Sequence, residues 1–149
     1  MEPNIKQLVQ EVLEKGHVMS LATVDSGGVW VSDVVYIHDE NFNLYWTSSE
    51  HVRHSKALSE NNNLAGSITV NGKGEDNLGL QFAGIATKVQ EDRYDLTVKH
   101  FAKRGKTAPP QGDESLKGRF WYMLQPNKIE LINEKLFGFH KQKYEPANI

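Results

Sequence analysis

The chain is organised around the stretch Leu44-Tyr-Trp-Thr-Ser-Ser-Glu-His-Val-Arg-His-Ser-Lys-Ala-Leu58. It begins like the apolar end of a strand, continues through three hydroxyl residues and enters a segment with helical spacing. Arg53, His54 and Lys56 place positive charge in that segment. The first turn of a helix has backbone N–H groups without partners and a partial positive charge, so it suits a phosphate. The stretch therefore predicts a strand, a turn and an anion-binding helix.

The turn before this helix carries the hydroxyl residues Thr47, Ser48 and Ser49. Thr47 and Glu50 fit a T-x-x-E capping box, which predicts that the helix starts directly after the strand. In an alternative interpretation, the hydroxyls only cap a surface helix whose basic residues face water. Spacing alone leaves both interpretations open.

Length and composition indicate one ordinary domain over residues 1–149. The absence of cysteine excludes disulfides, thiolate metal sites and a cysteine nucleophile, and it fits a reducing cytoplasm. We expect a soluble cytoplasmic protein, because there is no signal-peptide pattern and no apolar run of about 20 residues. A net charge of -2 gives no overall field for nucleic acid, and no membrane or nucleic-acid partner is expected.

Apolar spacing marks the first elements of the chain. Apolar residues recur every three or four positions from Ile5 to Leu13, which predicts an amphipathic helix that ends at Gly16. Two β-rich runs, 18–24 and 29–37, flank a Gly27-Gly28 turn and predict a hairpin. A third strand is expected over 42–46, and the anion-site helix is expected to end near residues 61–63.

The sequence pattern of the second half of the chain also predicts short strands and few helices. Strands are expected at 64–70, 78–89, 119–124 and 128–132, with a turn at 125–127, a helix at 91–104 and an exposed loop at 103–113. Gly79 and Gly84 suggest a bulge or a close backbone approach inside their strand. About seven short strands without βαβ alternation predict a mainly β fold, a small antiparallel barrel with flanking helices on its outside.

The sequence shows few residue patterns that indicate a metal site, a catalytic nucleophile or a nucleotide-binding loop. His51 and His54 have helical spacing but lack a recognisable third ligand, so no metal site is expected. No G-x-S-x-G nucleophile motif is present. The segment Gly72-Lys-Gly74 is interpreted as a turn rather than a nucleotide-binding loop.

Five short motifs occur in order across nearly the whole chain: His17-Val-Met-Ser-Leu-Ala-Thr23, Gly27-Gly28, Tyr45-Trp-Thr47, Arg53-His54, and Pro126-x-x-Ile129-Glu130 with His140. Together they resemble the flavin mononucleotide (FMN)-binding split-barrel family related to pyridoxamine 5'-phosphate oxidase. The resemblance implies a split barrel that forms a homodimer and holds FMN in clefts between its subunits. It implies a flavoprotein branch of the family rather than the oxidase itself.

The resemblance also implies a set of cofactor contacts. Arg53 falls on the family's phosphate-binding arginine, and His54 falls where the oxidase has lysine. A guanidinium suits a phosphate dianion, whereas a histidine adds charge only when it is protonated. The expected cofactor-binding residues are Trp46, Thr47, Ser48, Ser49, Arg53, His54, Lys56 and Gln81.

Several positions depart from the pattern of the oxidase. Asp33 stands where the oxidase has an arginine, Gly79 where it has a glutamine, and Ile132 where it has a tryptophan. Gln81 lies two residues after Gly79, and it could face the same side of the strand.

A further departure concerns the substrate. His140 matches a histidine of the oxidase's substrate clamp, but Gly138 replaces the partnering arginine. His140 is therefore either a substrate contact or a tail histidine without a role. Pyridoxamine phosphate is not the expected substrate.

These observations lead to the expectation of a small flavin-dependent oxidoreductase whose substrate the sequence does not reveal. The flavin supplies the redox chemistry, so no catalytic acid or base has to be visible in the sequence. Two alternatives stay open. One is a relative that binds haem through His17, His51, His54 or His140, and the other is a cofactor-free dimeric binding module.

Overall fold

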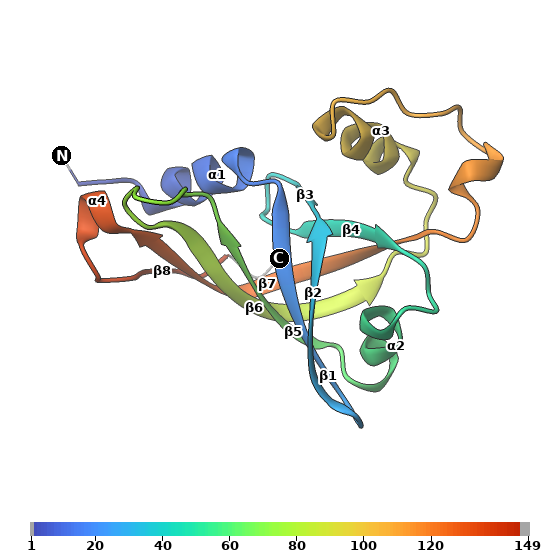
Figure 1. Cartoon of the computed structure of the whole chain (residues 1–149), viewed down its shortest axis with the longest axis horizontal. Coiled ribbons are helices and arrows are strands. Elements are labelled where there is room, and N and C mark those ends of the chain that lie inside the picture. The colour runs from blue at the N-terminus through green and yellow to red at the C-terminus, as the bar shows by residue number, and fades with distance from the viewer. Residues whose placement is uncertain (1, 147–149) are drawn as a thin grey trace.

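The chain folds into one curled antiparallel sheet with helices on its outside (Figure 1). The computed structural model describes residues 2–146. The strands follow the order β2-β1-β5-β6-β7-β4-β3, and β8 pairs with β7. Their bounds are β1 Val18–Asp25, β2 Gly28–Val35, β3 Ile37–His38, β4 Leu44–Ser48, β5 Asn63–Thr69, β6 Leu78–Lys88, β7 Phe120–Asn133 and β8 Gln142–Tyr144. The predicted mainly β split barrel is confirmed.

The helices cover different parts of this half-barrel. They are α1 Ile5–Lys15, α2 Arg53–Glu60, α3 Tyr94–Lys103 and the short α4 Glu134–Phe137, with a 3-10 turn η1 at Glu114–Leu116. Helix α1 packs on β6, β7 and β8, α2 packs on β1 and β2, and α3 packs on β3. The described residues include no helix that is both long and apolar enough to span a membrane.

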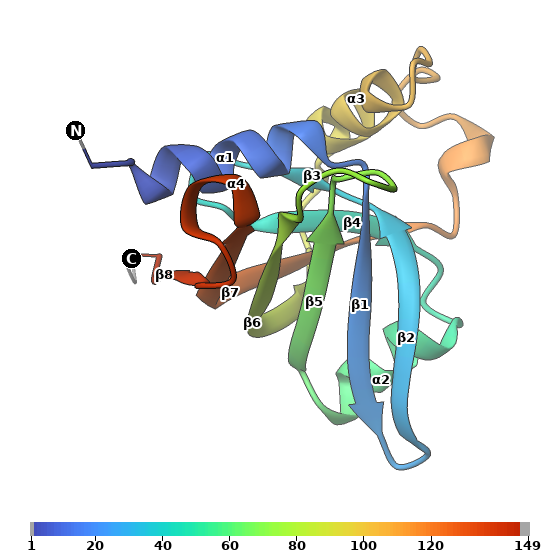
Figure 2. The same cartoon turned by 60° about the vertical axis from the view of Figure 1, so that its left-hand side comes forward.

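Helix α1 lies across one end of the sheet (Figure 2) and follows the predicted apolar pattern. The Asn4 side chain caps it by accepting a hydrogen bond from the Gln7 N–H at 3.1 Å. Val12 and Leu13 on its inner face are buried. The buried Tyr36 hydroxyl donates to the Leu13 carbonyl at 2.7 Å, which ties the C-terminal end of α1 to the segment between β2 and β3.

The predicted hairpin around the glycine pair is formed by β1 and β2. Asp25 faces Gly28 in the register, so only Ser26 and Gly27 form the loop. Gly28 has a φ of 109°, a conformation that favours glycine over residues with a Cβ. The glycine pair therefore fixes the register of the hairpin.

The expected irregularity in the sixth strand is also confirmed. The register between β6 and β7 shifts between Ala83 and Gly84. A Cβ on Gly84 would collide with the Gln125 carbonyl oxygen, so the two backbones approach more closely than a side chain allows.

The predicted turn at 125–127 is wrong, because β7 runs without a break from Phe120 to Asn133. Pro126 pairs with Gly84 and Lys128 pairs with Ala83, which leaves Asn127 as the extra residue of a bulge. A bulge tolerates proline because it interrupts the hydrogen-bond ladder locally. The sequence signal for a turn thus marked a bulge.

The predicted capping box is also wrong. Thr47 lies inside β4, and α2 starts only at Arg53 after the N-cap Val52. Among residues 2–146, no side chain makes a capping hydrogen bond to this helix. The Ser49 hydroxyl instead accepts the His51 N–H at 3.1 Å, which bends the connection between strand and helix.

Candidate functional site

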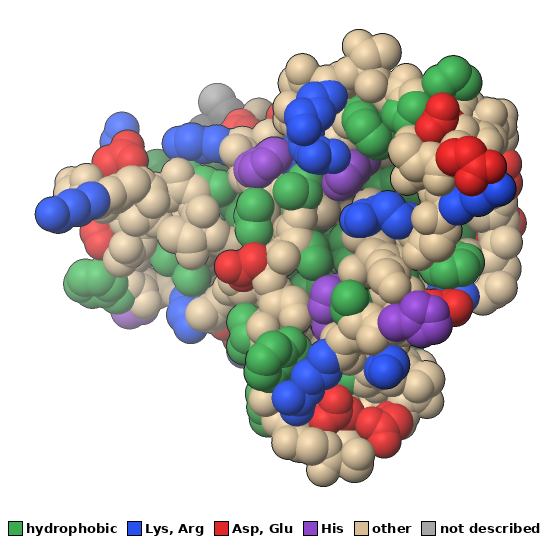
Figure 3. Space-filling view, turned by 45° about the vertical axis from the view of Figure 1, so that its right-hand side comes forward, with side chains coloured by type: hydrophobic (Ala, Val, Ile, Leu, Met, Phe, Trp, Pro, Cys, Tyr) green, Lys and Arg blue, Asp and Glu red, His purple; other side chains and the backbone are tan. Residues whose placement is uncertain are grey.

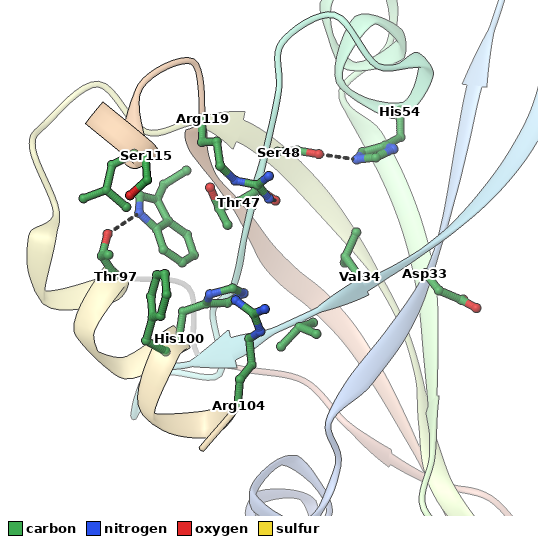
Figure 4. Close-up of a pocket in the computed structure, with 14 residues that line it drawn as sticks. Asp33, Val34, Thr47, Ser48, His54, Thr97, His100, Arg104, Ser115 and Arg119 are labelled. Atoms are coloured by element: carbon green, nitrogen blue, oxygen red, sulfur yellow. Dashed lines mark hydrogen bonds between the residues drawn. The ribbon is translucent and has the colours of Figure 1, made fainter. Parts of the chain in front are cut away.

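A cavity of about 530 Å³ opens between β2, β4, α2, α3 and the segment that leads into β7. Thr47, Ser48, His54 and Arg119 line it on one side, and His100 and Arg104 line it on the other (Figure 4). In the view of Figure 3, Lys, Arg and His side chains surround the hollowed centre of one face of the molecule. The cavity therefore combines polar strand residues with basic and histidine side chains.

The β4 side of the cavity contains a hydrogen-bonded pair. Ser48 Oγ and His54 Nε2 lie 2.8 Å apart. Burial lowers the pKa of His54 below its usual value, so the ring is neutral near pH 7. His54 would therefore contribute charge to an anion only if binding brought a proton with it.

The α3 side of the cavity is aromatic and basic. The His100 ring packs edge-on against Trp121, with ring centroids 5.6 Å apart. Trp121 Nε1 donates to Thr97 Oγ1 at 3.3 Å, which fixes the orientation of the indole. Arg119 donates to the Thr47 carbonyl at 3.3 Å and so connects this side of the cavity with β4.

His100 is the most strongly perturbed histidine of the cavity. Its exposed fraction is 8 %. Burial, followed by the nearby charges of Arg104 and Arg119, lowers its pKa from 6.5 to about 4. The ring is therefore neutral at physiological pH and can both donate and accept a hydrogen bond.

Acid should destabilise the fold through His100. The unfolded chain binds a proton near pH 6.5 and the folded chain only near pH 4, so stability falls as the pH drops through this window. We expect the free energy of unfolding to decrease by roughly 2 kcal/mol between pH 7 and 4.5 from this residue. Urea denaturation of His100→Gln should show a smaller decrease, while the control His51→Gln, at an exposed position, should behave like the wild type. Equal decreases in all three proteins would contradict the assignment.

A second, more open hollow of about 700 Å³ lies on the other side of the first turn of α2. Arg53 and Lys56 line it. The Arg53 guanidinium pairs with Asp25 at 3.4 Å and stacks on the Trp30 ring at 4.5 Å from its centroid. We call this hollow, with Asp25, Ser26, Gly27, His51, Arg53, Lys56, Ser59 and Glu60 around it, the basic hollow.

The structure thus divides the residues expected to bind a cofactor into two groups. Thr47, Ser48 and His54 line the cavity, whereas Arg53 and Lys56 line the basic hollow. The two groups meet at the start of α2, where Arg53 and His54 are neighbours in the chain. Ser49 is half-buried between strand and helix and lines neither space.

Trp46 is placed in the core rather than beside the cavity. Its exposed fraction is 0 %, and its ring stacks on Tyr122 with centroids 5.8 Å apart. Side chains alternate along a strand, so its inward orientation follows from the buried Leu44 two residues earlier. Any cofactor contact from this strand falls to Thr47 and Ser48.

Gln81 and His140 lie elsewhere on the surface. Gln81 is exposed on β6 and accepts a hydrogen bond from Lys141 Nζ at 2.7 Å. His140 is exposed in the segment after α4. Neither side chain lines the cavity or the basic hollow of its own chain.

Sequence reasoning missed His100, Arg104 and Arg119. A signal existed for His100, because it follows Leu96 by four residues and both are buried on one face of α3. Arg104 is the C-cap residue of α3 and Arg119 precedes β7, and no local pattern connects them.

The four histidines considered as haem ligands differ in their exposure and in their distance from the cavity. His17, His51 and His140 are exposed, and of the four only His54 lines the cavity. Within residues 2–146, no three His, Cys, Asp or Glu side chains gather in a way that could hold a metal ion.

No family model matches the chain. The UPF0306 protein plu4501 of Photorhabdus laumondii is 23% identical over 138 residues, which cover 91% of this chain and 92% of that protein. A pyridoxamine 5'-phosphate oxidase-like protein from Listeria innocua has a similar structure, with a TM-score of 0.70, 15% identity, and coverage of 87% of this chain and 99% of that one. HutZ, the heme storage protein of Vibrio cholerae, has a similar structure with a TM-score of 0.66 and 17% identity. The alignment covers 87% of this chain and 95% of that one. The chain therefore has the split-barrel fold of the pyridoxamine 5'-phosphate oxidase-like proteins.

Proposed function

We propose that the chain binds FMN as a homodimer and acts as a flavin-dependent oxidoreductase on a small substrate. The observation that carries this proposal is the pairing of two spaces at the start of α2. The basic hollow, which is lined by Arg53 and Lys56 together with the carboxylates of Asp25 and Glu60, lies on one side of its first turn, and a polar cavity of about 530 Å³ lies on the other. FMN has a phosphate at one end and a planar ring at the other, so it matches this division.

The phosphate would be held by α2 and its basic side chains. Within the described residues no side chain caps the helix, and the Ser55 N–H already donates to the Val52 carbonyl at 3.1 Å, so the donors left for a phosphate are the N–H groups of Arg53 and His54. Arg53 adds a guanidinium, which suits a phosphate dianion, and Lys56 adds a second positive charge one turn further along. Arg53 would exchange its pairing with Asp25 for one with the phosphate.

The ring would lie against Thr47, Ser48 and His54. When bound, the flavin supplies the redox chemistry, and the protein binds, orients and shields it. The Ser48–His54 hydrogen bond holds both side chains in place at the cavity wall. A neutral His54 adds no charge beside the flavin ring on the β4 side of the cavity.

A second copy of the chain would complete the site. The edge strand β2 exposes the apolar side chains of Val29 (70%), Trp30 (43%) and Val31 (60%). An exposed apolar edge strand favours association with another chain. Gln81 and His140 do not line their own cavity, and they could contribute only to the site of a partner.

Light scattering at micromolar concentration should give the mass of a dimer. Val31→Lys should shift the protein toward monomer, because it places a charge in the apolar contact. Val98→Lys is the matched control, since Val98 is exposed on α3 rather than on β2. A monomeric wild type, or equal dissociation of both variants, would contradict the dimer.

Haem binding is the second candidate. HutZ has the same fold and is a heme storage protein. Both His54 and His100 line the cavity with neutral rings, the form in which histidine ligates iron. The visible absorption spectrum of freshly purified protein distinguishes the candidates, because bound flavin, bound haem and cofactor-free protein have different spectra.

A further inference from the structure

We infer that Asn71 and Gly72, in the loop that joins β5 to β6, form a self-catalysed deamidation site at which a carboxylate replaces the Asn71 amide. The reaction starts when the Gly72 backbone nitrogen attacks the Asn71 side-chain carbonyl. This pair is the single Asn-Gly pair of the sequence, and the sequence pattern indicated only a turn there. Neither residue lines the cavity or the basic hollow, so the inference is independent of the proposed function.

The nucleophile of this reaction is held against a base. The Gly72 N–H donates a hydrogen bond to Glu75 Oε1, and the Glu75 N–H donates back to the Gly72 carbonyl at 3.2 Å. This turn keeps the carboxylate beside the nitrogen whose proton has to leave before the nitrogen can attack. A Cβ at position 72 would lie 2.7 Å from Glu75 Oε1, so glycine keeps both groups unobstructed.

The Asn71 side chain is oriented as the electrophile. Its Oδ1 accepts the Leu78 N–H at 3.0 Å. A backbone donor at this oxygen stabilises the negative charge that develops there when the carbonyl carbon is attacked, as in an oxyanion hole. The Asn71 Nδ2 donates to the Gly72 carbonyl at 3.4 Å, which keeps the amide close to the Gly72 peptide group. One short loop therefore supplies nucleophile, base and oxyanion donor together.

The reaction balances with water as the only co-reactant. A bond forms between the Gly72 nitrogen and Asn71 Cγ, and the bond from Cγ to Nδ2 breaks. The Gly72 proton passes through Glu75 to the departing nitrogen, which leaves as ammonia. Water then opens the resulting cyclic imide at Cγ, which gives aspartate, or at the main-chain carbonyl, which gives isoaspartate. Residues 72–77 are exposed, so water can reach the imide.

Both products alter the end of the β5–β6 hairpin, which lies at the end of the sheet that α1 covers (Figure 2). The Val70 N–H donates to the Leu78 carbonyl at 2.9 Å, and the Asn71 contact with Leu78 continues this pairing. Isoaspartate lengthens the main chain at this point and so disturbs the pairing. Each product also adds a negative charge to a loop that already contains Glu75 and Asp76. Deamidation should therefore loosen this end of the hairpin.

Peptide mapping by mass spectrometry follows the conversion of Asn71 in the full chain during incubation near neutral pH, and chromatography separates aspartate from isoaspartate. We expect the folded protein to convert Asn71 at least about tenfold faster than the protein unfolded in urea, because only the fold holds the base and the oxyanion donor at the amide. Glu75→Gln keeps an acceptor oxygen but removes the base. It should slow the conversion in the folded protein by roughly tenfold or more and leave the rate in urea unchanged.

Asp76→Asn is the matched control, because it removes a carboxylate from the same exposed loop, whereas the Gly72 N–H is bonded to Glu75. It should leave the rate within about twofold, since exposed charges that make no contact interact weakly. Circular dichroism should confirm that both variants are folded. Conversion that is no faster in the folded wild type than in urea, or equal rates in folded Glu75→Gln and Asp76→Asn, would overturn the site.

Discussion

Arg53→Ala should weaken FMN binding by roughly tenfold to a hundredfold and change riboflavin binding little. Hydrogen bonds to charged groups contribute about 1.5–3 kcal/mol, and riboflavin has no phosphate to lose. Arg53 lines the basic hollow rather than the cavity that would hold the ring, so its loss should not disturb ring contacts. Fluorescence titration of both ligands against both proteins measures the effect.

A variant of the residue that pairs with Arg53 provides the control for this experiment. Asp25→Asn removes the carboxylate 3.4 Å from the guanidinium, so FMN should bind as tightly as to the wild type or more tightly. Equal losses of FMN and riboflavin affinity in Arg53→Ala would place Arg53 away from the phosphate.

Trp46→Ala should lower the free energy of unfolding by about 3–5 kcal/mol. The indole is fully buried, stacks on Tyr122 and belongs to the core beneath the sheet, so its removal leaves a large cavity. Urea denaturation of the flavin-free protein measures this loss.

Trp30→Ala is the comparison for Trp46→Ala. Trp30 is 43% exposed on β2, and its replacement should cost much less stability in the monomer. A loss below about 1 kcal/mol for Trp46→Ala would mean that Trp46 is not a core residue.

The parts of the fold that depend on local pattern could be predicted from the sequence. The helix from Ile5 follows a regular apolar period, and the hairpin depends on a glycine pair between two β-rich runs. The irregularity at Gly84 was also visible, because a glycine inside a strand marks close backbone approach.

Other parts depend on tertiary pairing and could not be read locally. The turn signal at Pro126 became a bulge because β6 supplies a pairing partner on both sides of it. The capping signal at Thr47 was overridden because β4 continues to Ser48 in pairing with β7. A strand partner can therefore outweigh a local propensity.

The candidate site shows the same limit. The sequence predicted one site for Arg53 and the residues Thr47, Ser48 and His54. The last three line the same cavity, whereas Arg53 lines the basic hollow. Successive helical residues point in directions about 100° apart, so Arg53 and His54 face different spaces. Arg104 and Arg119 join the cavity only through the packing of α3 and the segment before β7.

Native mass spectrometry of the protein mixed with FMN reports the number of subunits and the number of bound cofactors together. We expect a dimer that carries two FMN molecules, one for each cavity and its basic hollow. A monomer with one FMN, or a dimer that remains free of FMN at saturating concentration, would contradict it.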